Sequence, residues 1–269
     1  MNREQKIAYL LDKEHYCADD LNMIVEILRG EGGCPWDREQ THKSIRNDFI
    51  EETYEVIEAI ETENSKLMQE ELGDVLLQVV FHTEIEREAG RFEFSDVTDG
   101  ICRKLIHRHP HVFGDVSVSS SEQVLSNWDK IKSEEKSRIT MTDKLRSIPP
   151  MLPALMRATK VGKKAVCFDF ADAEAVLIKL DEETAELKTA IASESKERVS
   201  EELGDLLLTI TSLARKLGID SEESLRYATD KFIDRFEKVE NEVLNQGFDM
   251  NDLRMEQLDK IWDQIKHNQ

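Results

Sequence analysis

The sequence predicts an all-α protein built from two tandem helical-bundle domains. The composition is 34% charged and 39% hydrophobic, with only 11 Gly and 5 Pro among 269 residues, and this favours helices that have one apolar stripe and one solvated face. Apolar residues recur at steps of three and four, and the same motifs occur twice along the chain. The length is sufficient for two domains that each bury a core.

An internal repeat defines the two halves, because matching motifs recur at a fixed offset. EETYE at residues 51–55 matches EETAE at 182–186, and EELGDVLL at 70–77 matches EELGDLLL at 201–208, both with an offset of 131. Later in each half, KLIHR at 104–108 matches KFIDR at 231–235, and WDKIK at 128–132 matches WDQIK at 262–266. The chain therefore contains two copies of one domain.

The boundary between the copies is predicted where the helical pattern is interrupted. A polar stretch leads there into Ile148-Pro149-Pro150, and such segments are typical of linkers. We therefore predict an N-terminal domain at residues 1–136, a linker at 137–153 and a C-terminal domain at 154–269.

Each half is expected to contain about four helices. The first in the N-terminal half spans residues 41–60, and its apolar residues recur at helical spacing and predict one buried face: Ile45, Phe49, Ile50, Val56, Ile57 and Ile60. The second spans residues 65–89 and stops at Gly90, a favourable C-terminal cap, as its counterpart stops at Gly218. A third helix carries a Lys-x-x-x-Arg pair, and a fourth carries the tryptophan motif.

The acidic motifs predict a metal site in each half. Glu52 and Glu55 share one helix face, as do Glu71 and Asp74 on the next helix, so two antiparallel helices can aim four carboxylates at one point. At about 4 Å each like-charged pair repels by about 4 kcal/mol at an effective dielectric near 20, and the cluster therefore needs a counter-ion. An all-oxygen ligand set favours Mg²⁺, with Mn²⁺ as a substitute.

A solvated acidic face is the alternative interpretation of such a motif. The apolar residues around Glu71 and Asp74 argue against it, because that segment is too apolar to lie wholly in water and half-buried carboxylates need partners. The repeat supplies a matching set in the second half: Glu183, Glu186, Glu202 and Asp205.

Basic residues complete the predicted site of the second half. Lys231 and Arg235 lie one turn apart and can contact phosphate oxygens of a departing pyrophosphate. Lys179 precedes Glu183 by four residues, so it either reaches the same site or pairs with that glutamate along the helix. The first half has Asp48 at the position of Lys179, so the two halves are not equal.

The charge and cysteine content restrict the partners. A formal net charge of −20 repels polyanions, so no nucleic acid is expected to bind. No apolar run approaches a membrane span and no signal peptide precedes the first motif, so neither membrane insertion nor export is expected. The cysteines, at positions 17, 34, 102 and 167, are far apart and predict reduced thiols in a cytoplasmic protein.

The acidic and histidine motifs allow three other interpretations. A ferritin-like di-iron protein needs a Glu-x-x-His motif on each of two helices, and only residues 39–42 fit. A zinc site at His107, His109 and His111 is disfavoured, because Pro110 breaks the spacing and no cysteine is nearby. The third is an acidic helical module that binds a partner or a nucleotide without cleaving it, a hypothesis that applies to the first half above all.

The chain resembles the MazG family of all-α nucleoside triphosphate pyrophosphohydrolases in its tandem-domain form, over about residues 23–266. Five motifs carry the resemblance: GGCPWD at 32–37, QTH at 40–42, EETYE at 51–55, ELGD at 71–74 and RHPHVF at 108–113. The resemblance implies MazG-like helical bundles, a homodimer, and Mg²⁺-dependent hydrolysis of nucleoside triphosphates to monophosphate and pyrophosphate, with broad specificity in clearing the nucleotide pool. It also implies that the C-terminal half is the active one and that the first half is a second site or an assembly domain.

The resemblance assigns roles to individual residues. Eight acids are expected to ligate metal: Glu52, Glu55, Glu71, Asp74, Glu183, Glu186, Glu202 and Asp205. The expected substrate-binding residues are Lys179, Lys231, Arg235, Trp262, Lys104 and Arg108. Among these two sets Glu183, Glu202, Lys231 and Arg235 are the catalytic candidates, in a hypothesis of metal-assisted hydrolysis at the α-phosphorus.

Overall fold

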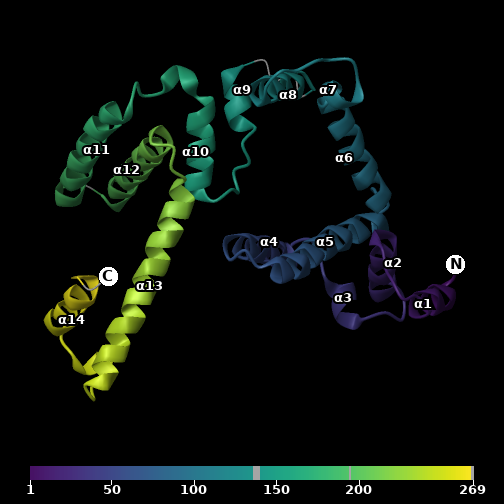
Figure 1. Ribbon diagram of the computed structural model, residues 1–269, viewed down its shortest axis with the longest axis horizontal. Helices are drawn as coiled ribbons and strands as arrows, with labels where there is room; N and C mark the ends of the chain where they lie inside the picture. Colours follow the sequence, from purple (N-terminus) through teal and green to yellow (C-terminus); the bar gives the residue numbers. More distant parts are fainter. Residues whose placement is uncertain (136–139, 194, 268–269) are drawn as a thin grey trace. The chain divides into compact units, whose positions relative to one another are not determined.

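The computed structural model describes residues 1–135, 140–193 and 195–267, and within these ranges all regular structure is helical (Figure 1). The prediction of an all-α fold is confirmed. The chain divides into two compact units, Met1–Lys132 and Ser133–Gln269. In the described part of the chain, no helix has the length and hydrophobicity required to cross a bilayer.

The first unit is organised around an antiparallel pair of long helices. The elements in chain order are α1 (Arg3–Leu11), α2 (Ala18–Arg29), α3 (Pro35–Glu39), α4 (Arg46–Glu61), α5 (Ser65–Glu88), α6 (Phe94–Arg108), α7 (Pro110–Phe113) and α8 (Ser121–Glu135). Helix α4 lies along α5, and α2 packs on the other end of α5 (Figure 1). Val25, Ile45, Val80 and Phe81 form the core between them.

The second unit repeats this pair and adds a helix before it. Its elements are α9 (Met141–Arg146), α10 (Ala154–Lys164), a 3-10 turn η1 (Val166–Phe168), α11 (Ala173–Ser193), α12 (Lys196–Lys216), α13 (Ser221–Asn245), a 3-10 turn η2 (Met250–Asp252) and α14 (Met255–His267). Helices α11 and α12 form the antiparallel pair, and α10 packs on α12. Val239, Val243 and Ile261 form a second core where α13 meets α14.

Glycine ends the second helix of each pair, as the sequence predicts. Gly90 follows α5 with φ 67° and Gly218 follows α12 with φ 70°, a left-handed conformation that favours glycine at a helix C-terminus. In each case the next residue donates its N–H five residues back, from Arg91 to Glu86 O and from Ile219 to Ala214 O. The chain therefore leaves the antiparallel helix pair in the same way in both halves.

The predicted start of the first helix at residue 41 is wrong, because α4 begins at Arg46. Thr41 and Ser44 form a local turn instead: the Thr41 N–H donates to Ser44 Oγ at 2.8 Å, and the Ser44 N–H donates to Thr41 Oγ1 at 3.2 Å. Such side-chain bonds compete with the helical backbone pattern. The segment before α4 is therefore a capped turn.

The predicted buried face of that helix is buried only in part. Ile45 is 2% exposed, but Ile50 and Ile60 are each 52% exposed and Ile57 is 38% exposed. The middle of α6 and most of the first half of α13, residues 95–107 and 223–234, are also exposed on every side. Apolar side chains in these stretches, among them Ile101, Leu225 and Ile233, are thus exposed in the described chain.

The predicted linker at residues 137–153 lies partly outside the described residues. From Thr140 onward it is ordered: Thr140 caps α9, its side chain accepting from the Asp143 N–H, and Ile148 is buried. This part of the segment belongs to the second unit.

Candidate active site

The antiparallel pair of the first unit brings three predicted ligands together. Glu52 and Glu55 lie three residues apart on α4, and Glu71 lies on α5. One carboxylate oxygen from each lies within 4.8 Å of the other two. The helical spacing of the sequence and the pairing of the two helices are sufficient to create this cluster.

Glu71 and Glu52 of this first cluster have raised pKa values. Burial, followed by the hydrogen bond that protonated Glu71 donates to Glu55 and repulsion by Glu55, Asp74 and Glu52, raises the pKa of Glu71 to about 7. Burial and the charges of Asp74 and Glu55 raise the pKa of Glu52 as well. Desolvation and like charge both disfavour the ionised form, so without a cation these acids retain protons at a pH where exposed glutamates have lost them.

The second unit contains the equivalent cluster. Glu183 and Glu186 lie on α11 and Glu202 on α12, and again one oxygen from each lies within 4.8 Å of the others. Glu183 is 5% exposed and Glu202 is 2% exposed. The two clusters therefore bring together the same three positions of the repeat.

Two cations distinguish the second cluster from the first. Lys179 Nζ lies 2.9 Å from Glu183 Oε1 and 2.8 Å from Glu182 Oε1. Arg198 pairs with Glu202, and its Nη1 lies 2.9 Å from Glu201 Oε2. The Lys179 ammonium therefore lies at the cluster, where it pairs with Glu183.

Arg198 is a residue that the sequence interpretation missed. It precedes Glu202 by four residues, as Lys179 precedes Glu183, so the signal was present in the spacing. At the matching positions the first half has Asp48 and Leu67, and among the described residues no Lys or Arg pairs with Glu52, Glu55 or Glu71. The first cluster is purely anionic, whereas the second combines anions and cations.

The fourth predicted acid of each set lies beside its cluster. Asp74 and Asp205 are not among the residues whose oxygens lie within 4.8 Å of one another. Their charges still act there, because Asp74 raises the pKa of Glu52 and Glu71 and Asp205 raises that of Glu202. Their role as ligands stays a prediction.

The Lys-x-x-x-Arg pairs lie on α6 and α13, the helices that follow the antiparallel pair; each half has more helices than the four that the sequence predicts. Lys231 is exposed on α13, and within the described ranges no hydrogen bond or ion pair joins it to Glu183, Glu186 or Glu202. Arg235 lies one turn further along α13, which runs from the α12 end of the unit to α14 (Figure 1). The equivalent Lys104 is exposed on α6.

The tryptophan motifs pack against these same helices. The Trp262 ring lies 5.2 Å from that of Phe232, between α14 and α13. In the first half, the Arg108 guanidinium lies 5.5 Å from the centre of the Trp128 ring, and Arg108 itself is 8% exposed. Both aromatic residues have a packing role in the described structure, and contact of Trp262 or Arg108 with a substrate stays a prediction.

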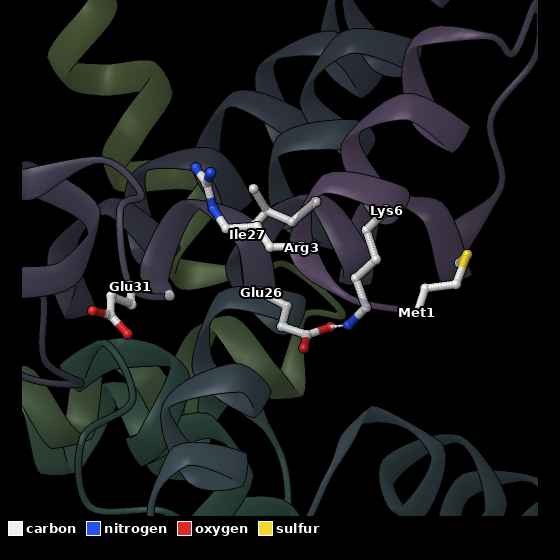
Figure 2. Close-up of a pocket in the computed structure, with 7 residues that line it drawn as sticks. Met1, Arg3, Lys6, Glu26, Ile27 and Glu31 are labelled. Carbon is white, nitrogen blue, oxygen red and sulfur yellow. Dashed lines mark hydrogen bonds and ion pairs between the residues drawn. The ribbon is translucent and has the colours of Figure 1, made fainter.

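A separate cavity lies between α1 and α2. The residues that line it precede both acidic clusters in the sequence. It has a volume of about 370 Å³ and is lined by Met1, Arg3, Lys6, Glu26 and Ile27 together with the 30–31 turn (Figure 2). Lys6 pairs with Glu26 there, and Arg3 Nη2 donates to Gly32 O at 2.7 Å. Lys6, Glu26 and Arg3 thus have partners within the protein.

Comparison with known proteins places the chain in a family. Residues 40–113 and 171–240 match the MazG nucleotide pyrophosphohydrolase domain. The chain is 45% identical over 250 residues to the nucleoside triphosphate pyrophosphohydrolase/pyrophosphatase MazG of Thermotoga maritima, covering 92% of this chain and 95% of that protein. It is 42% identical over 258 residues to the nucleoside triphosphate pyrophosphohydrolase of Escherichia coli K12, covering 93% and 97%.

A more distant relative aligns over less of its own length. The nucleoside triphosphate pyrophosphohydrolase of Mycolicibacterium smegmatis is 34% identical over 226 residues, covering 83% of this chain and 59% of that protein. The two matched segments coincide with the two halves that carry the acidic clusters. This chain belongs to the MazG family of nucleotide pyrophosphohydrolases, as a member with two MazG segments in tandem.

Proposed function

We propose that this chain is a divalent-metal-dependent nucleoside triphosphate pyrophosphohydrolase whose C-terminal half carries the activity. The observation on which this proposal depends is the arrangement of Lys179 and Arg198 on a buried carboxylate cluster. Carboxylates attract a divalent cation, and the two basic groups attract phosphate. The names of the relatives, which are nucleoside triphosphate pyrophosphohydrolases, support the same activity.

The donor set fits magnesium. Glu183, Glu186 and Glu202 would hold the ion, with Asp205 as the fourth acid, and every donor is a hard carboxylate oxygen. When bound, Mg²⁺ or Mn²⁺ would neutralise the cluster and polarise the phosphate oxygens of the substrate. The raised pKa of Glu202, caused first by its burial, agrees with a cluster that lacks sufficient positive charge.

Lys179 and Arg198 have a second role in this proposal. In the described structure each neutralises one buried acid of the cluster. Once a cation satisfies those acids, Lys179 and Arg198 would be able to donate to phosphate oxygens of a triphosphate, so that charge-assisted bonds to phosphate would replace the charge-assisted bonds that they now make to carboxylates.

Hydrolysis at the α-phosphorus is the finer part of the proposal. It gives a nucleoside monophosphate and pyrophosphate, and Lys231 and Arg235 would stabilise the negative charge on the departing pyrophosphate. Broad specificity for base and sugar is expected, in a role that clears the nucleotide pool. The four cysteines are free thiols, in agreement with a cytoplasmic enzyme.

We also propose that the enzyme is a homodimer. Residues 95–107 of α6 and 223–234 of α13 are exposed on every side, although they include Ile101 at 40%, Leu225 at 57% and Ile233 at 57% exposure. A helix with apolar residues in water is typically buried against another element. A second copy would supply that element in both halves at once, and would bring α13 residues close to a cluster.

The first half is proposed to bind metal or to support assembly, without being the main catalytic half. Its cluster has the carboxylates but lacks the paired cations of the second. In the first half, Lys104 and Arg108 correspond to Lys231 and Arg235. The Arg108 guanidinium packs on the Trp128 ring.

An isotope experiment tests both the activity and the bond that is cleaved. The protein is incubated with Mg²⁺ and a panel of ribo- and deoxyribonucleoside triphosphates in water enriched in ¹⁸O, and the products are analysed by mass spectrometry. Attack at the α-phosphorus places the label in the monophosphate, whereas attack at the β-phosphorus places it in pyrophosphate. Absence of pyrophosphate with every substrate would contradict the enzymatic proposal.

A further inference from the structure

Helix α10 carries a cationic face that has no ion-pair partner. Four basic residues lie within its eleven residues, which include no acid: Arg157, Lys160, Lys163 and Lys164. In the described part of the chain none of the four forms an ion pair. This is unexpected in a protein with a net charge of −20, where acids are plentiful. We name these four residues the α10 cationic face.

The geometry of α10 directs this face to solvent. The opposite side of the helix packs on its own unit: Thr159 Oγ1 lies 3.3 Å from Ser221 Oγ, and a Cβ on Gly162 would lie 2.9 Å from Arg215 Nε. At 100° per residue, Arg157, Lys160 and Lys164 fall on the side away from Thr159 and Gly162, and the exposed Lys163 lies at the edge of that side. Favourable interaction with the helix dipole accounts for Lys163 and Lys164 in the last turn, but not for Arg157 near the start.

An exposed aromatic residue adjoins the cationic face on a fixed turn. Phe168 is 93% exposed and Val166 is 68% exposed, both in η1 directly after α10. The next residue, Asp169, is held by α12: Arg215 Nη1 lies 2.9 Å and Lys216 Nζ 2.9 Å from Asp169 Oδ2. The turn is thus anchored while Phe168 points outward, and rigid exposed aromatic residues are typical anchors of protein interfaces.

This surface is distinct from the acidic cluster of the second unit. Gly162 lies against Arg215, and thirteen residues of α12 separate Arg215 from Glu202. That separation corresponds to about 20 Å along the helix, which exceeds the reach of a lysine side chain. The α10 cationic face is therefore not explained by binding of substrate at Glu202.

We propose that the α10 cationic face, together with Val166 and Phe168, is a docking surface for an acidic segment of a partner protein that also carries an apolar side chain. Charge complementarity selects the acidic residues, and Phe168 and Val166 select the apolar one. A nucleic-acid strand fits less well, since α10 is about 16 Å long and spans too few phosphates to overcome a net charge of −20.

The test uses the full chain and a defined probe. A fluorescent 16-residue peptide of alternating Glu-Asp pairs and Leu or Phe residues is titrated with protein, and its anisotropy is compared with that of an all-Glu/Ser peptide and of a 20-mer of single-stranded DNA. We expect the acidic apolar peptide to bind best. Phe168→Ala and the double variant Arg157→Glu/Lys160→Glu should each weaken binding at least tenfold, with unchanged thermal melting and unchanged pyrophosphate release.

A control double variant, Lys238→Glu/Lys260→Glu, makes the same change in net charge on exposed positions of α13 and α14. It should bind the peptide as the unmodified chain does. Equal loss in this control, equal binding of the all-Glu/Ser peptide, or stronger binding of DNA would each overturn the proposal. A change in oligomeric state in Phe168→Ala, measured by light scattering, would overturn it in favour of contact between copies of this chain.

Discussion

The guanidinium of Arg198 pairs with the buried carboxylate of Glu202 one turn further along α12. The equivalent pair of positions in the first half holds Leu67 and Glu71, so only the second cluster has a cation there. The two clusters thus use the same three acidic positions of the repeat but differ in charge.

Replacing Arg198 with Gln should lower kcat/KM for a triphosphate by about tenfold to a hundredfold, because one charge-assisted phosphate contact is lost. The same variant should bind Mn²⁺ more tightly in the absence of nucleotide, since no internal cation competes for Glu202. Steady-state kinetics and paramagnetic titration measure the two effects. Arg198→Lys serves as the conservative control and should retain most of the activity. Unchanged kcat/KM in Arg198→Gln would contradict the proposed role.

Glu202→Gln should abolish pyrophosphate release, and Glu71→Gln should leave most of it. The two residues occupy matching positions, so the pair of variants separates the contributions of the two halves. Far-ultraviolet circular dichroism should show that both remain helical. Glu201→Gln, one residue away and on an exposed side chain, is the control for local disturbance of α12. The reverse pattern of activity would assign catalysis to the first half.

The first cluster should make metal-free protein less stable as pH rises. The pKa of Glu71 is raised to about 7 from an ordinary value of 4.5, so the folded protein binds this proton when the unfolded chain has released it. The free energy of unfolding therefore falls between about pH 4.5 and pH 7 and no longer depends on this group above that range. Thermal melts in a chelator measure the slope, which Mg²⁺ should reduce. The same slope in Glu71→Gln would exclude this origin.

Asp169→Asn should lower the free energy of unfolding by about 2 kcal/mol, because it removes charge-assisted bonds that join η1 to α12. Arg215, followed by Lys216, holds the pKa of Asp169 well below its usual 3.8. This stabilisation is present above pH 3.8 and is lost as the pH falls below that value, so the difference between the two proteins should shrink in acid. Urea denaturation at pH 7 and pH 3 measures it. An equal difference at both values would argue for a neutral packing effect.

Ile233→Glu should dissociate the proposed dimer, since it places a charge on the exposed part of α13. Multi-angle light scattering should show a fall to the mass of one chain, which is 31.1 kDa, and specific activity should fall with it. Glu237→Gln on the same helix is the control and should remain dimeric. A mass of 31.1 kDa for the unmodified chain would contradict the assembly proposal.

Much of the fold follows from local sequence signals. The 131-residue offset predicts two equivalent hairpins, and Gly90 and Gly218 predict their ends because only the left-handed conformation closes the helix there. The helical spacing of Glu52 and Glu55, combined with an antiparallel partner, predicts four convergent acids, and the structure brings three of them together. These features depend on residues close in sequence and on one packing contact.

The rest could not be predicted because it depends on competing or distant interactions. The turn at Thr41 and Ser44 replaces a helical start that the apolar pattern favours. Ile50, Ile57 and Ile60 have helical spacing, but spacing does not show what covers them. Arg198 was overlooked because a basic residue four positions before a glutamate is common on solvated helices. Only the burial of Glu202 shows that this pair belongs to a site.

Because of the exposed stretch of α13, the amount of intact protein would depend on the concentration of the protein itself. Residues 223–234 are exposed in the described chain, although Phe232 contacts Trp262, so in the proposed dimer a newly made protomer would offer proteases an accessible helix until it meets a second copy. Mass action would set the fraction of protomers in the proposed dimer. That fraction would determine both how much protein escapes proteolysis and how much activity it has. A cell that makes little of this protein would lose most of its activity through degradation, and a modest rise in synthesis would restore it more than proportionally.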